Sequence, residues 1–257
     1  MLYFITVMSF YTAKIFECKS SESNGTIFFV GPYTGREVYF KPFLSSMSVN
    51  YRVIYIQPKD SVLNYKKPEN LAIAIDEVGE FMQLNLQKSS GLKKRVKSKI
   101  EGTSPNYFVG DSIGSYFGYN LIPVIKKIDI YYFNAAGAFI SHLVENAEFK
   151  KLLKTNSFSA EEIEHANKIW SDYEVDRLHG IKLRGKSIRI INSSKDKLVQ
   201  KKHTKELFEL ADIRGASVQF EYTRLPGHQS QTLAINLYSK KIERFIKQSI
   251  LSHARKS

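Results

Sequence analysis

The chain has 257 residues, enough for one large domain with its own core, and its 43% hydrophobic and 25% charged residues argue against disorder. The formal net charge of +13 comes from lysines scattered along the sequence. This pattern does not indicate nucleic-acid binding, although it is compatible with peripheral contact with an anionic surface. Cys18 is the only cysteine, which excludes an intramolecular disulfide and favours a reducing compartment.

The sequence contains no segment that predicts a membrane span or a signal peptide. No run of about 20 apolar residues occurs. The apolar residues 1–8 lack a basic segment and a small-residue cleavage site, and either Met1 or Met8 can serve as the first residue. One dense basic run, residues 93–99, is expected at a solvated helix end. We therefore expect a soluble, cytoplasmic protein.

Strand-like apolar runs alternate with helix-like periodic stretches along the chain. The expected strands are residues 11–19, 25–30, 51–56, 106–109, 128–133, 187–191 and 217–222. The expected helices are residues 36–47, a stretch from 71, residues 113–122, residues 200–211 and a stretch from about 231. Alternating strands and helices pair their strands in parallel through right-handed crossovers. The sequence thus predicts an α/β fold, a mostly parallel twisted sheet with helices on both faces.

Residues 140–185 interrupt this alternation because they are mostly helical in pattern. We expect them to form a helical cap over one end of the sheet, with residues 1–139 and 186–257 as the core. The aromatic side chains of this segment either line an acyl pocket or pack the cap onto the core: Phe158, Trp170 and Tyr173.

The sharpest motif is the G-x-S-x-G pentapeptide Gly110-Asp111-Ser112-Ile113-Gly114, between an expected strand and an expected helix. A serine at such a turn is held out of the sheet in a strained backbone conformation. Glycines two residues before and after it remove side chains that would clash there. The placement favours Ser112 as a nucleophile over a plain glycine-rich turn.

A nucleophilic serine needs a base, and the base needs an anionic partner that orients it. His228 lies in a loop after the last expected strand, and Asp196 follows the strand at 187–191. Loops at the carboxyl ends of strands are where open sheets build their sites. The order Ser112, Asp196, His228 therefore predicts a catalytic triad. Three other histidines fall in helical stretches and are expected on the surface: His142, His165 and His203.

Over nearly its whole length the sequence resembles the α/β-hydrolase family. GDSIG looks like the nucleophile elbow of that family, KDKLV like its acid loop and LPGHQ like its histidine loop. Residues 140–185 fall where the family inserts its cap. The resemblance implies that Ser112 is the nucleophile, Asp196 the acid and His228 the base, with no metal or organic cofactor.

The chain departs from the family at the oxyanion loop, where the usual His-Gly-x is replaced by Gly31-Pro32-Tyr33-Thr34-Gly35 after Val30. In one register the backbone N–H groups of Tyr33 and Ile113 hold the oxyanion. A shift of one residue places Pro32 there, and proline has no N–H to donate. Because the loss of one donor costs about 10²–10³ in rate, we expect the Tyr33 register.

These residues predict a serine hydrolase that cleaves a carboxylic ester or thioester of a small acyl substrate through an acyl-enzyme. An acyltransferase would use the same triad. Gly110-Asp111-Ser112 also resembles the GDS block of the SGNH hydrolases, with Asp176 and His179 as a D-x-x-H pair. A third alternative, suggested by the oxyanion loop and the basic surface, is a hydrolase-like scaffold that binds without catalysis.

Overall fold

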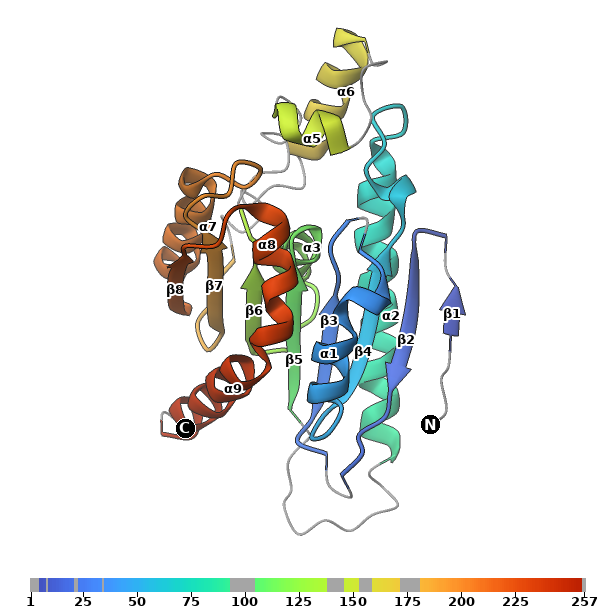
Figure 1. Ribbon diagram of the computed structural model, residues 1–257. Coiled ribbons are helices and arrows are strands. Elements are labelled where there is room, and N and C mark those ends of the chain that lie inside the picture. Colours follow the sequence, from blue (N-terminus) through green and yellow to red (C-terminus); the bar gives the residue numbers. More distant parts are fainter. Residues whose placement is uncertain are drawn as a thin grey trace.

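The computed structural model describes residues 5–7, 9–20, 23–33, 35–92, 105–137, 146–152, 159–171 and 181–255. Within them an eight-stranded sheet has the order β1-β2-β4-β3-β5-β6-β7-β8 (Figure 1). The strands are β1 (Ile5–Val7), β2 (Tyr11–Phe16), β3 (Thr26–Val30), β4 (Arg52–Pro58), β5 (Asn106–Asp111), β6 (Ile130–Asn134), β7 (Ser187–Ser193) and β8 (Ser217–Thr223). β2 pairs antiparallel with both β1 and β4, and the other pairs among these strands are parallel. The predicted mostly parallel sheet is confirmed.

Helices cover both faces of this sheet. They are α1 (Glu37–Met47), η1 (Asp60–Val62), α2 (Glu69–Leu92), α3 (Ile113–Leu121), α5 (Ala147–Leu152), α6 (Ala160–Ser171), α7 (Lys201–Ile213), α8 (His228–Leu233), η4 (Ala234–Leu237) and α9 (Ser239–Ala254). Residues of α1 and α9 share one core with the sheet, and residues of α2, α3 and α7 share the other. Figure 1 shows this division, with α1 and α9 in front of the sheet and α2 behind it.

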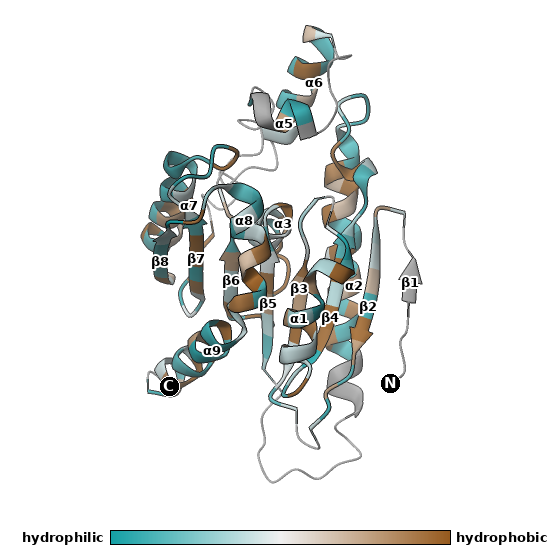
Figure 2. Cartoon of the chain, in the orientation of Figure 1, coloured by the Kyte–Doolittle hydropathy of each residue, from teal (hydrophilic) through white to brown (hydrophobic). Residues whose placement is uncertain are grey.

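The sequence of β3 shows why the central strands are apolar over most of their length. All five of its residues are buried. Phe28 and Val30 point into the core with α2 and α3, whereas Ile27 and Phe29 point into the core with α1. A strand that is covered on both faces has no solvent side on which to place polar residues. Figure 2 shows the resulting apolar band along the middle strands.

The C-terminal helix expected from about residue 231 is in fact three shorter elements, α8, η4 and α9. Asn236 explains the break between them. Its side chain accepts a hydrogen bond from the N–H of Phe43 (3.3 Å) and donates one to the carbonyl of Tyr39 (2.8 Å). These contacts tie the tight turn of η4 to α1 and redirect the chain into α9. The short edge strand β1 was not predicted, since three residues carry too little periodicity.

The segment expected as a cap is described in part, as α5 and α6, which Figure 1 places beyond the carboxyl ends of the parallel strands. Trp170 of α6 is fully buried. Its indole N–H donates to the carbonyl of Pro68 (3.0 Å), and its ring centroid lies 5.3 Å from that of Tyr65. Of the two roles considered for Trp170, the structure shows packing. Phe158, Tyr173 and the basic run at 93–99 lie outside the described residues.

No helix in the described part of the chain is both long and apolar enough to cross a membrane.

Candidate active site

The turn from β5 into α3 holds Ser112 in an unusual backbone conformation, with φ 55° and ψ −116°. Such a conformation costs about 1–3 kcal/mol for a non-glycine residue and needs support from its surroundings. The N–H of Ser112 donates to the carbonyl of Asn134 (2.9 Å), and its own carbonyl accepts the N–H of Ser115 (2.9 Å). The strained turn is therefore fixed by the ends of β6 and α3.

Close backbone contacts explain why both of these positions in the motif are glycine. A Cβ atom on Gly114 would lie 1.9 Å from the carbonyl oxygen of Val30, and one on Gly110 would lie 2.6 Å from the carbonyl oxygen of Gly114. Both obstacles are backbone atoms, which cannot rotate away as a side chain can. Neither position therefore accepts a side chain without distortion of the turn.

Ser112, His228 and Asp196 meet at the carboxyl edge of the sheet. The Ser112 hydroxyl Oγ lies 2.8 Å from His228 Nε2, and His228 Nδ1 lies 2.8 Å from Asp196 Oδ2. The other carboxylate oxygen of Asp196 accepts the N–H groups of Leu198 (2.8 Å) and Val199 (2.9 Å). The Asp196 carboxylate is fully buried, and the His228 side chain is only 16% exposed. Hydrogen bonds thus connect a hydroxyl, an imidazole and a buried carboxylate.

Neither Gly31 nor Pro32, at the start of the loop after β3, has a free backbone amide. The N–H of Gly31 donates to the carbonyl of Ile56 (2.9 Å), and Pro32 has no N–H. Within the described part of the chain, the backbone amides of Tyr33 and Ile113 donate to no protein atom. Thr34, which completes the expected loop, lies outside the described residues.

The phenol of Tyr33 forms a hydrogen bond that holds its loop in place. Its hydroxyl donates to the carbonyl of Asp60 (2.8 Å). Burial, followed by the nearby negative charge of Asp60, raises the pKa of Tyr33 to about 12, so the phenol stays neutral. This contact fixes the loop that carries the free Tyr33 amide.

A buried polar network that was not predicted lies behind the serine turn. The Asn134 side-chain amide donates to Asp111 Oδ1 (2.8 Å) and to the Gln231 carbonyl (2.9 Å), and Gln231 Nε2 donates to Asn134 Oδ1 (2.6 Å). The Thr223 hydroxyl donates to Gln231 Oε1 (2.5 Å). The network joins the Ser112 turn to α8, the helix that begins with His228. The one sequence signal was the position of Asn134 directly after the expected strand at 128–133.

Asp111 is the titratable member of this network. Its side chain is completely buried, Oδ2 has no hydrogen-bond partner, and desolvation raises its pKa well above the ordinary value of 3.8 in spite of the bond from Asn134. The folded protein therefore holds a proton that the unfolded chain releases above about pH 4. Because its folded pKa is raised, Asp111 contributes its full stability below pH 3.8 and progressively loses it as pH rises toward the folded pKa.

Asp111→Asn should accordingly stabilise the protein at alkaline pH, since an amide keeps the oxygen that accepts from Asn134 and carries no titratable proton. We expect the melting temperature of the variant to exceed that of the wild type at pH 8 by several degrees, and the difference to shrink toward pH 4. Thermal unfolding followed by circular dichroism across this range measures it. A difference that is constant with pH, or that grows on acidification, would contradict the protonated state of Asp111.

The histidines that the sequence placed in helical stretches have different outcomes. His165 on α6 is exposed, as expected. The prediction of a surface position was wrong for His203, which is 5% exposed, because the face of α7 that carries it packs beside Gly137 and Val199. Its Nδ1 lies 3.1 Å from Glu206 Oε2. Three other predicted residues lie outside the described residues: His142, Asp176 and His179.

Comparison with known proteins identifies the fold. No protein-family model and no curated protein matches the sequence. Among solved structures, Est1E from Butyrivibrio proteoclasticus is 13% identical with a TM-score of 0.58, over 97% of this chain and 98% of that one. The Pyrococcus furiosus esterase Pf2001 is 14% identical with a TM-score of 0.61, over 96% of this chain and 90% of that one.

The Pyrococcus horikoshii acylaminoacyl peptidase is 12% identical with a TM-score of 0.62, over 95% of this chain and 40% of that one. Likeness at such low identity is likeness of fold. The chain has the α/β-hydrolase fold, as its sequence resemblance implied.

Proposed function

We propose that this protein is a serine hydrolase that cleaves a carboxylic ester or thioester through an acyl-enzyme. The observation that supports it most is the pair of 2.8 Å contacts that link Ser112 to His228 and His228 to Asp196. The fold is shared with the esterases described above, and fold alone does not decide activity. The proposal therefore depends on the site.

In the proposed mechanism His228 takes the Ser112 proton as Oγ attacks the acyl carbon. The backbone amides of Tyr33 and Ile113 donate to the oxyanion of the tetrahedral intermediate. His228 then gives its proton to the departing oxygen or sulfur, and the acyl group remains on Ser112. A water molecule activated by His228 attacks the acyl-enzyme, and the returned proton restores the serine. An acyltransferase would replace this water with another acceptor.

Asp196 is proposed to hold the imidazole in the tautomer that accepts a proton at Nε2. Asp196→Asn tests this role sharply. Because Oδ1 already accepts two backbone N–H groups, the amide oxygen of asparagine should take that place and turn its NH₂ toward His228 Nδ1. The imidazole would then carry its proton at Nε2, where it cannot act as a base.

We expect Asp196→Asn to lower kcat by about 10⁴-fold with little change in stability. A panel of p-nitrophenyl esters and acyl-CoA thioesters, run on wild type and variant, measures this and identifies the acyl class. Asp212→Asn, the same change on the exposed surface of α7, is the matched control. A wild type that turns over no ester or thioester would instead favour the non-catalytic scaffold.

The proposed cap, residues 140–185, would cover this edge of the sheet. The position of α5 and α6 beyond the carboxyl ends of the strands supports it (Figure 1).

A further inference from the structure

A pocket of about 450 Å³ opens beside the catalytic imidazole. It lies between the loop that carries Asp196 and the loop that carries His228, and its lining includes Lys195, Lys197, Leu198, Pro226 and His228. A volume of this size accommodates a small organic group. His228 is therefore part both of the candidate site and of the pocket lining.

The direction of proton transfer indicates which half of the substrate occupies this pocket. When the ester or thioester bond breaks, its electron pair goes to the departing oxygen or sulfur, which takes the proton held at His228 Nε2. The departing atom must therefore lie against the imidazole. A group attached to that atom is brought to the mouth of the pocket lined by His228, whereas the acyl group stays on Ser112.

The described side chains that line the pocket carry two positive charges, on Lys195 and Lys197. Lys195 and Lys197 are both exposed, and neither forms an ion pair with any described residue. No described acidic side chain lines the pocket. The nearest carboxylate in sequence, Asp196, is fully buried and already bonded to His228 and to two backbone amides. The pocket lining thus includes two lysines that no described carboxylate neutralises.

We propose that this pocket binds the alcohol or thiol half of the substrate, and that Lys195 and Lys197 select a half that carries a carboxylate or a phosphate. The inference rests on the proposed function and adds a substrate class to it. Ammonium groups bind both anions as point charges. Selection operates through contacts near the protein surface, so it weakens as ionic strength rises.

Three butyryl esters that share one aromatic frame test the inference. Their leaving groups are 3-hydroxybenzamide, which is neutral, 3-hydroxybenzoate, which carries a carboxylate, and 3-hydroxyphenyl phosphate. The readout is the kcat/KM for each anionic ester divided by that for the neutral one. Intrinsic differences in ester reactivity cancel when this ratio is compared between wild type and variants.

We expect K195Q/K197Q to lower the ratio about five- to tenfold, since each exposed charge contact contributes about two- to fivefold. Raising ionic strength from about 0.05 M to about 0.5 M should lower the wild-type ratio in the same direction. The ester whose ratio falls more, the carboxylate or the phosphate, identifies the preferred anion.

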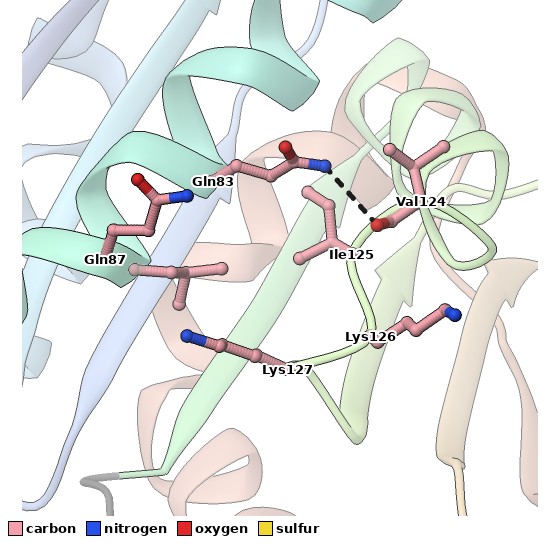
Figure 3. A pocket seen from close by; sticks show the side chains of 7 residues that line it. Gln83, Gln87, Val124, Ile125, Lys126 and Lys127 are labelled. Carbon is pink, nitrogen blue, oxygen red and sulfur yellow. Dashed lines mark hydrogen bonds between the residues drawn. The ribbon is translucent and has the colours of Figure 1, made fainter. Parts of the chain in front are cut away.

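Lys126 and Lys127 provide a control with the same change of net charge. They line a separate pocket of about 220 Å³ with Gln83 and Ile125, and their side chains point in opposite directions (Figure 3). They precede β6, so they lie at the amino edge of the sheet, opposite the site. K126Q/K127Q should leave the ratio unchanged.

An unchanged ratio in K195Q/K197Q, or an equal fall in both double variants, would overturn the inference, since the second result reflects net charge alone. These outcomes are distinct from failure of the proposed function. If the proposed function is wrong, the wild type hydrolyses none of the three esters. Hydrolysis of all three with no dependence on Lys195 and Lys197 refutes the substrate class only.

Discussion

Ser112→Ala is expected to lower kcat by about 10⁶-fold and to abolish covalent labelling by a fluorophosphonate probe. The reason is that the hydroxyl oxygen 2.8 Å from His228 Nε2 is the only protein atom that bonds to the acyl carbon in the proposed mechanism. Labelling is measured on the intact protein by mass spectrometry, and the labelled peptide is mapped to its residue.

Ser45→Ala is the matched control, because Ser45 is an exposed serine on α1. It should label and turn over substrate as the wild type does. If Ser112→Ala kept wild-type turnover, or if the probe mapped to another serine, Ser112 would not be the nucleophile.

His228→Ala should slow turnover by about as much as the loss of the serine, because members of a triad act as a unit. Ser112→Ala and His228→Ala should differ in their labelling by the probe. The hydroxyl of Ser112 is still present in this variant, so we expect slow labelling by the fluorophosphonate rather than none. The rate of probe incorporation with time separates the two variants.

The same measurement decides between the two proposed bases. His179→Ala should label and turn over normally if His228 is the base, and should be inactive if the chain uses the D-x-x-H pair of the SGNH hydrolases. His165→Ala, on the exposed face of α6, controls for loss of an imidazole elsewhere. Full activity in His228→Ala would remove the proposed mechanism.

The order of strands and helices in the core could be predicted because apolar residues repeat with a different period in each kind of element. Apolar runs such as that of β3 and the helical spacing of α2 repeat over enough residues to be distinctive. Two features could not be predicted. β1 depends on the edge pairing of only three residues. The break within the C-terminal helices depends on the side-chain contacts of Asn236 with α1.

The candidate site divides in the same way. Ser112, Asp196 and His228 were predicted as a group because each follows a strand, and parallel strands bring their carboxyl ends to one edge. The network of Asn134, Gln231 and Thr223 was not predicted, since a polar residue in a single sequence gives no sign of which distant partner it bonds.

The buried Trp170 is an intrinsic fluorescence probe of the packing of α6. It is the single tryptophan of the chain, so indole emission originates from one position, where α6 contacts Tyr65 and Pro68. Its wavelength therefore reports the polarity at that junction alone. A shift to the red while the circular dichroism holds steady would signal that α6 had separated from an otherwise folded domain.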